Sequence, residues 1–198
     1  MNDPKGSLWH RWDLHFHTPS SFDYERADVT DNQIVDSLIQ AGLSAVAVTD
    51  HHVIDIGRIR NLRAIAKDKL TIFPGIEFRS DQGGEAIHYI SIFPEDSDLE
   101  HVWTTLQGGL GLTLAAIKDK GGDEELYVPM EDGARITRDL GGIVSIHAGA
   151  KSNSIEGISN REKFQQRIKY DITNKYVDLM EIGQLRDIDR HLKILSGP

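Results

Sequence analysis

The sequence predicts an α/β fold in which parallel strands form a barrel, and three observations support this prediction. Strand-like apolar runs alternate with segments of helical periodicity, which is the pattern of repeated β-α units. Runs such as Ala45–Val48 are apolar throughout, as expected of strands buried on both faces. The residues that follow the first strand, His17-Thr18-Pro19, do not resemble the glycine-rich phosphate loop of a doubly wound sheet. The barrel is therefore favoured over the doubly wound sheet.

Each predicted strand is a short run rich in Val, Ile, Leu, Ala or Phe, and most of these runs carry or end in a histidine or a carboxylate. Because side chains alternate along a strand, His15 and His17 of the first run should project to one face. The predicted strands cover residues 11–17, 45–49, 72–78, 87–93, 142–147 and 177–182.

The predicted helices lie between these strands and have recognisable ends. Asp28 or Thr30 can cap the first helix, which should stop at Gly42. Pro129 suits the first turn of a later helix, because its missing N–H costs nothing there. The predicted helices cover residues 30–42, 59–66, 99–106, 112–118, 129–140, 161–170 and 187–195.

Composition restricts the class of protein and the kind of metal site. The chain of 198 residues is long enough for one domain with a substantial core. It has no cysteine, so any metal must be held by His, Asp and Glu. No stretch resembles a signal peptide or a membrane span, and we expect a cytoplasmic location. The net charge of −9 argues against a general nucleic-acid-binding domain, whose phosphate contacts need clustered Lys and Arg.

Residues that can bind a metal recur on the predicted strands. The carboxyl ends of parallel strands converge at the mouth of a barrel, where such folds carry their chemistry. Imidazole nitrogens and carboxylates gathered there suit zinc, manganese or iron. Each residue alone could be a satisfied polar group, but the same placement on five strands indicates a shared site. The residues are His15, His17, His51, Glu77, His88 and His147.

These motifs resemble, in the same order, those of the PHP (polymerase and histidinol phosphatase) superfamily of metal-dependent phosphoesterases. The resemblance spans about residues 11–183 and rests on Asp-Leu-His15-Phe-His17-Thr, Thr-Asp50-His51, Gly-Ile-Glu77, His88 and Ile-His147. It implies a distorted (β/α)7 barrel related to the TIM barrel. It also implies two or three divalent metal ions, Zn, Mn or Fe, at the barrel mouth.

The resemblance further implies a role for individual residues. Glu77 is the expected bridge between two ions, because a carboxylate has two oxygens to share. His51 would belong to a third ion site. Asp23 stands where the family often has another histidine, and it can bind through oxygen. The implied metal ligands are His15, His17, Asp23, His51, Glu77, His88 and His147.

Further residues are expected to act beside these ligands. Asp50 is expected to orient a neighbouring imidazole. Phosphate oxygens need cationic partners, and Lys151 and Arg79 follow ligand-bearing strands closely enough to reach the same mouth, although each could be a solvated surface charge. His52 should point to the opposite face from His51 and play a structural role.

The sequence departs from the family pattern at its end. The last strand of the family closes with an Asp-x-His motif that supplies two ligands, whereas Asp189-Arg190-His191 lies in a predicted helix. We therefore expect one domain, residues 1–198, that lacks the last strand of the barrel and forms the N-terminal part of a longer protein. The opening Gly6-Ser-Leu-Trp-His-Arg-Trp-Asp13 and the segment His147–Ser154 also resemble PHP domains fused to AAA- or SMC-like ATPases, which implies an ATPase partner region.

Three classes of function remain open. The first, which the residues favour, is a phosphoesterase: a nuclease working with an ATPase region, or a phosphatase of small metabolites of the histidinol-phosphatase type. The second is an amidohydrolase-like deaminase or C–N hydrolase, whose barrel also begins with His-x-His. That class often uses a carboxylated lysine on a strand, and no predicted strand here contains lysine. The third is a non-catalytic regulatory module, against which the retained ligands argue.

Overall fold

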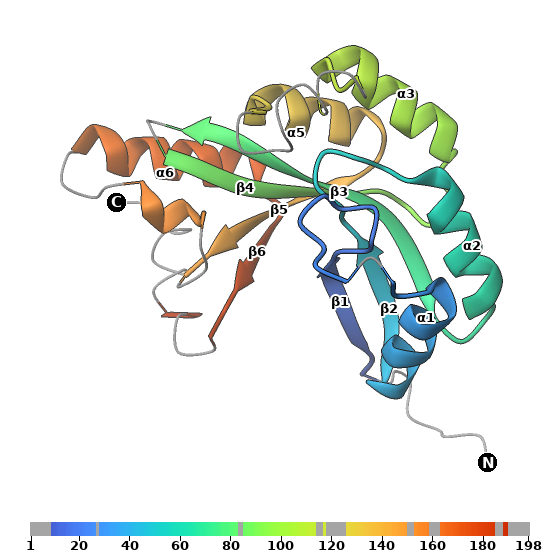
Figure 1. Ribbon diagram of the computed structural model, residues 1–198. Coiled ribbons are helices and arrows are strands. Elements are labelled where there is room, and N and C mark those ends of the chain that lie inside the picture. Colours follow the sequence, from blue (N-terminus) through green and yellow to red (C-terminus); the bar gives the residue numbers. More distant parts are fainter. Residues whose placement is uncertain are drawn as a thin grey trace.

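The strands form one curled sheet, a half-barrel with the helices on its outer face (Figure 1). The computed structural model describes residues 9–26, 28–82, 85–113, 117, 126–149, 153–158, 163–184 and 188–189. Within these residues, strands that follow one another along the chain are also neighbours in the sheet. The strands are β1 (Arg11–Phe16), β2 (Leu43–Val48), β3 (Thr71–Gln82), β4 (Glu85–Ile92), β5 (Ile143–Ala148) and β6 (Leu179–Ile182).

One strand runs against the others, so the prediction of an all-parallel sheet is wrong. β1, β2 and β3 pair in parallel, as do β5 and β6, whereas β4 is antiparallel to both β3 and β5. β3 ends at Gln82 and β4 begins at Glu85, and a parallel pair needs a crossover of roughly a dozen residues or more. The dipeptide Gly83-Gly84 between the two strands is a hairpin signal in the sequence.

The helices begin where the sequence offers capping groups. They are α1 (Asp31–Gln40), α2 (Ile56–Ala66), α3 (Leu99–Leu110), α5 (Met130–Asp139), α6 (Lys163–Tyr176) and a short 3₁₀ helix, η1 (Ile155–Gly157). Thr30 caps α1, as predicted: its hydroxyl accepts a hydrogen bond from Gln33 N, and Thr30 N donates to the Gln33 side chain. Asp55 and Asp98 cap α2 and α3 through their carboxylates, which accept hydrogen bonds from Arg58 N and His101 N.

Among the predicted helices, α6 differs most from the structure in extent. α6 continues to Tyr176, beyond the predicted end at Tyr170, because Ile168, Ile172 and Tyr176 extend one apolar stripe at helical spacing that packs on the core. The predicted helices at 112–118 and 187–195 lie largely outside the described residues, although residues 188–189 are helical. No helix in the described part of the chain is long and apolar enough to cross a membrane.

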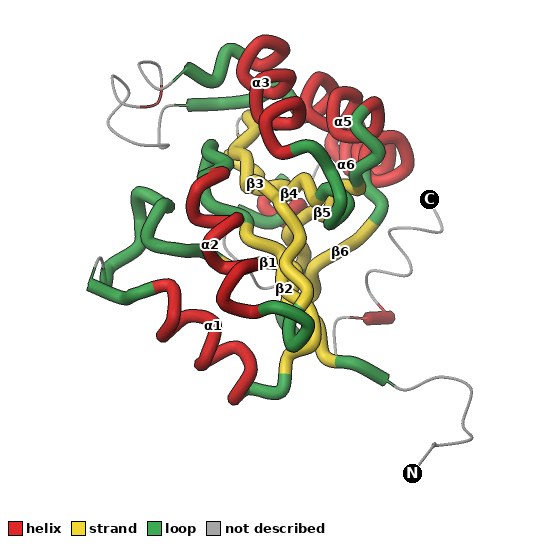
Figure 2. The backbone as a smooth tube through the Cα atoms, turned by 90° about the vertical axis from the view of Figure 1, so that its right-hand side faces the viewer, coloured by secondary structure: helices red, strands yellow, loops and turns green. Residues whose placement is uncertain are grey.

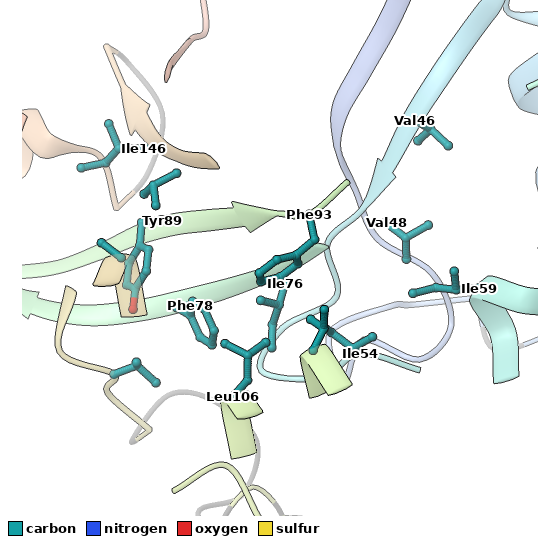
Figure 3. Close-up of a cluster of buried hydrophobic side chains, with 14 of the residues drawn as sticks. Val46, Val48, Ile54, Ile59, Ile76, Phe78, Tyr89, Phe93, Leu106 and Ile146 are labelled. Carbon is teal, nitrogen blue, oxygen red and sulfur yellow. The ribbon is translucent and has the colours of Figure 1, made fainter. Parts of the chain in front are cut away.

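The main core fills the space between the sheet and the helices. Phe78 and Tyr89 of the β3–β4 hairpin pack there with Leu106 of α3, all of them fully buried (Figure 3). Figure 2 shows α1 and α2 beside β1 and β2, with α3, α5 and α6 grouped at the other end of the sheet. A smaller apolar cluster occupies the opposite, inner face of the sheet, since its residues alternate with those of the main core. It contains Leu14, Ala47, Phe73, Ile90 and Ile92.

The half-barrel is open between its first and last strands. Among the described residues, β1 and β6 each pair with one neighbour only. A pocket of about 360 Å³ lies between them, and its lining includes Trp12, His15, Leu179 and Glu181. One of the polar residues in this lining, His15, is a predicted metal ligand, so the opening reaches the candidate site.

Candidate metal centre

A buried carboxylate, Glu77 of β3, lies at the centre of the candidate site. The residue is only 1% exposed. Its Oε2 atom lies 2.8 Å from His15 Nε2 and 2.7 Å from His17 Nε2, and the two ring nitrogens are 3.1 Å apart. Two ligands of a tetrahedral zinc ion, each about 2.0–2.1 Å from the metal, are about 3.3 Å apart. The three atoms lie closer together than this, at hydrogen-bond distances, so a small outward movement would let them share one cation.

The other oxygen of Glu77 faces a second set of rings. His88 Nδ1 lies 2.7 Å from Oε1, and His147 Nε2 lies 3.4 Å from the same oxygen. His51 belongs with the first oxygen, because its Nε2 atom lies 3.6 Å from Oε2. The structure thus brings the five histidines predicted as ligands around one carboxylate, which has one oxygen in each of two ring clusters.

The backbone of β3 explains why residues that follow β2 reach this carboxylate. Glu77 N donates a hydrogen bond to Asp50 O at 3.2 Å, and His52 N donates to Glu77 O at 3.0 Å. Gly75 permits this close packing, because a Cβ atom there would lie 2.9 Å from the Thr49 side chain and 3.1 Å from Val48 O, at the end of β2. The chain after β2 therefore runs beside β3 at the level of Glu77.

His88 reaches the site from the middle of an antiparallel strand. Its prediction as a ligand on a parallel strand had the wrong strand direction, because β4 runs against its neighbours. In the β3–β4 ladder, His88 lies opposite Arg79, and opposite residues project to the same face. Since Glu77 is two residues before Arg79, all three side chains belong to one face of the hairpin.

One residue of the site, Glu181 of β6, was missed by sequence analysis. Its Oε2 atom lies 2.8 Å from His15 Nδ1 and 3.5 Å from His147 Nε2. A carboxylate on the second nitrogen of a ligand imidazole fixes the orientation of the ring and raises its basicity. Glu181 pairs with His147 in the β5–β6 ladder, and this pairing could have pointed to it had the strand alignment been known.

The loop after β1 carries Asp23, the predicted oxygen ligand, to the same cluster. Its carboxylate lies 3.5 Å from His17 Nδ1 and 3.5 Å from His51 Nε2. Ser21 holds this arrangement, because its hydroxyl donates to Asp23 Oδ1 at 2.6 Å and accepts from His51 N at 3.3 Å. Asp23 is therefore positioned beside the rings of two other predicted ligands.

Asp50 makes contacts other than the predicted ones. Its two carboxylate oxygens accept hydrogen bonds from Thr18 N at 2.6 Å and from the Thr18 hydroxyl at 2.7 Å. No hydrogen bond from an imidazole to Asp50 occurs among the described residues, which corrects the expectation of a direct contact with a ring. Asp50 instead fixes the backbone at Thr18, immediately after His17. Any effect on the His17 ring is therefore indirect, through this backbone.

The structure describes Arg79, but not Lys151, of the two cationic residues predicted to bind phosphate. Arg79 is half-buried, and its buried Nε atom has no hydrogen-bond partner within the described residues. Lys151 lies outside the described residues. His52, predicted to be structural, is fully buried, and its ring lies 6.1 Å from that of Phe78 in the core.

The carboxylates and the rings shift one another's pKa values. Burial alone would raise the pKa of Glu77, but hydrogen bonds from His15, His17 and His88 outweigh it and hold this pKa far below its usual range. Burial alone would lower the pKa of His15, but hydrogen bonds to Glu181 and Glu77 raise it to about 9. The carboxylates therefore draw positive charge into the cluster, which protons on the rings or bound cations can supply.

Solved structures of low sequence identity share this fold. An amidohydrolase from Chromobacterium violaceum, with bound sulfate and no metal, gives a TM-score of 0.59 at 15% identity over 91% of this chain and 81% of its own. A protein from Bifidobacterium adolescentis, inferred to be a metal-dependent phosphoesterase, gives 0.59 at 12% identity over 93% and 82%. A two-domain protein from Bacteroides vulgatus, inferred to contain a PHP-like metal-dependent phosphoesterase, gives 0.52 at 17% identity over 86% and 43%. This chain therefore shares the fold of these proteins.

No family model matches the sequence, and no curated protein is significantly similar to it. The fold nevertheless brings the predicted ligands together. The nitrogen and oxygen donors fit zinc, manganese or iron, and the groups overlap, so ions bound in them would be neighbours. In each of four groups, the ligand atoms lie within 4.8 Å of one another: His15, His17 and Glu77; His15, His147 and Glu181; His17, Asp23 and His51; His51, Glu77 and His88.

Proposed function

We propose that this chain is a metal-dependent phosphoesterase of the PHP superfamily and binds two or three divalent ions, Zn, Mn or Fe. The observation that carries the proposal is Glu77, a buried carboxylate with one oxygen in each of two ring clusters. The similarity in fold to proteins inferred to be metal-dependent phosphoesterases supports it. The proposed ligands are His15, His17, Asp23, His51, Glu77, His88 and His147.

Neighbouring divalent ions supply, when bound, charge for the attacking and leaving oxygens of a phosphoryl transfer and a water of lowered pKa. The residues of the chain hold and orient the reacting groups. Glu181 orients the ring of His15, and Asp50 fixes the turn at Thr18 that follows His17. Arg79 would bind the phosphate, because its guanidinium lies on the face of Glu77 and has an Nε donor to spare. Lys151 is proposed as a second cationic partner of the phosphate.

The proposed substrate is a phosphodiester of a nucleic acid, gripped by an ATPase region outside this sequence. The net charge of −9 supports this division of labour, since a chain so acidic is poorly suited to hold a long duplex by itself. The alternative within the same chemistry is a phosphatase of small phosphorylated metabolites. Binding of a duplex DNA to this chain tests the role assigned to the partner region. Tight binding at physiological salt, with a steep salt dependence, would contradict the role assigned to the partner region.

A second candidate function is hydrolysis of a C–N bond, which the fold of the Chromobacterium violaceum amidohydrolase favours. The ligand geometry argues for the phosphoesterase instead. The central bridging position is held by the side chain of Glu77, so no carboxylated lysine is needed there. Activity on an amide substrate is therefore the competing outcome of the test.

The test combines metal content with hydrolysis of three substrates: bis-p-nitrophenyl phosphate, p-nitrophenyl phosphate and an N-acyl amino acid. We expect bound metal and hydrolysis of at least one phosphoester, both greatly reduced in Glu77→Gln. The matched control is His101→Ala, which removes an exposed histidine of α3 and should leave both unchanged. Hydrolysis of the amide alone would favour the C–N hydrolase. Bound metal without any hydrolysis would favour a regulatory module.

A further inference from the structure

The two ring nitrogens of His88 have different partners. Nδ1 lies 2.7 Å from Glu77 Oε1, and Nε2 lies 3.1 Å from the amide nitrogen Nδ2 of Asn153. A neutral imidazole carries one proton, so the partner of each nitrogen decides which of the two can offer a lone pair. In the present arrangement, Nδ1 donates to the carboxylate, and Nε2 accepts from the amide.

Asn153 contacts His88 at two points. The side-chain amide of Asn153 contacts the ring. In addition, the backbone carbonyl oxygen of Asn153 accepts a hydrogen bond from His88 N at 2.9 Å. Its φ of 53° lies in the left-handed region, which asparagine tolerates better than most residues with a side chain. The two contacts together fix the amide beside the ring.

The segment that carries Asn153 is anchored to the sheet. The Ser154 hydroxyl donates to Gly149 O at 3.1 Å, and η1 packs against β4 and β5. Ile155 and Ile158 are buried in the main core. Asn153 is therefore held against His88 by the packing that follows it, and its amide belongs to the interior of the site.

We propose that Asn153 is a positioning residue that makes Nδ1 the atom through which His88 binds an ion, in the group shared with Glu77 and His51. The inference rests on the proposed metal-binding function. With Nδ1 as the ligand atom, Nε2 carries the ring proton and donates it to Oδ1 of Asn153. Rotation of the amide by 180° exchanges its donor and its acceptor, so asparagine serves both states of the ring.

Two variants separate this role from simple anchoring of the loop. Asn153→Gly keeps the left-handed backbone and removes the amide, whereas Asn153→Asp keeps an oxygen acceptor for Nε2–H. We expect Asn153→Gly to weaken binding of the ion at His88 by roughly 10- to 100-fold, as for other partners of ligand histidines. Asn153→Asp should bind this ion nearly as well as the wild type. Asn174→Ala, on the exposed side of α6, is the matched control.

The measurements are zinc titration against a competing chelator and ¹H–¹⁵N correlation spectra of the histidine ring nitrogens. We expect the proton of His88 on Nδ1 in the metal-free protein and on Nε2 in the zinc-bound protein. Zinc bound through Nε2, unchanged affinity in Asn153→Gly, or equal losses in Asn153→Gly and Asn153→Asp would each overturn the inference alone. Failure of the wild type to bind zinc, manganese or iron would instead overturn the proposed function, and the inference with it.

Discussion

His15 on β1 and Glu181 on β6 are joined by a hydrogen bond of 2.8 Å between Nδ1 and Oε2, although their two strands do not pair. The contact crosses the opening of the half-barrel and meets the ring nitrogen that faces away from Glu77. His15 is thereby held from both sides by carboxylates. The last described strand consequently contributes to a site whose other carboxylates come from β3 and from the loop after β1.

Replacing Glu181 should weaken metal binding without removing a central ligand. In Glu181→Ala, the ring of His15 loses the acceptor that orients it, and we expect the zinc affinity to fall roughly 10- to 100-fold. A competition titration with a chelator measures this fall. The matched control is Glu100→Ala, which removes an exposed carboxylate of α3 that pairs with Arg60. Equal zinc affinities in Glu181→Ala and in the wild type would contradict the proposed role.

Loss of the charge on Glu77 should lower the metal content of the protein more than loss of the His51 ring. Glu77→Gln removes the negative charge that contacts both ring clusters, whereas His51→Ala removes a ring whose nitrogen lies 3.6 Å from the carboxylate. After dialysis of zinc-loaded protein, we expect elemental analysis to find less metal in Glu77→Gln than in His51→Ala. Equal metal contents in the two variants would count against Glu77 as the bridge.

The metal-free protein should lose stability as the pH rises from 6.5 to 9. His15 has an ordinary pKa of 6.5 and a folded pKa of about 9, so the folded state binds more protons in this interval than the unfolded chain. The resulting contribution to the free energy of unfolding, on the order of 2–3 kcal/mol, is complete below pH 6.5 and is lost by pH 9. The pKa of His17 is raised too, which acts in the same direction.

Urea unfolding in the presence of a chelator, at pH 6.5 and at pH 9, measures this change. The variant Glu181→Gln should show a smaller drop, because the hydrogen bond that contributes most to the raised pKa of His15 loses its charged acceptor. Asp50, whose pKa burial raises to about 6, adds a loss of stability between pH 3.8 and 6 and leaves the higher interval unaffected. A free energy of unfolding that is constant or increases from pH 6.5 to 9 would contradict the prediction.

Arg79→Ala should impair turnover of a phosphoester while the metal content stays normal. Loss of a charge-assisted hydrogen bond to phosphate, worth about 1.5–3 kcal/mol, corresponds to a decrease in kcat/KM of roughly 10- to 150-fold. The control variant Arg135→Ala removes a guanidinium that is 59% exposed on α5. Unchanged kcat/KM in Arg79→Ala would show that the guanidinium does not contact the substrate.

The sequence was sufficient to predict most residues of the histidine and carboxylate cluster, because their identity depends on local pattern. His15 and His17 are two residues apart, and His147 closes an apolar run, so neither prediction needed knowledge of strand pairing. His88 was predicted on a parallel strand, whereas its strand is antiparallel to both neighbours. Its side chain still reaches the site because alternation along a strand, and hence the face that a residue occupies, is independent of strand direction.

The residues that were missed or misread depend on contacts between distant segments. Glu181 acts on His15, which is 166 residues earlier in the chain, and β6 has only four residues. Asp50 was expected to contact an imidazole ring. Its carboxylate accepts hydrogen bonds from Thr18 instead, because the segments that follow β1 and β2 run side by side. Such pairings follow from the geometry of the folded sheet, which local sequence patterns do not contain.

In the hairpin of β3 and β4, one strand register determines both which residues enter the core and which residues lie on the face of Glu77. Phe78 lies opposite Tyr89 in the ladder, and Arg79 lies opposite His88 on the reverse side. A register shift of one residue in β4 would turn His88 toward the helices and expose Tyr89 at the mouth of the half-barrel. The rings of Phe78 and Tyr89, 5.1 Å apart and fully buried, oppose that shift. Hydrophobic packing on the far side of the hairpin thus determines that an imidazole faces Glu77.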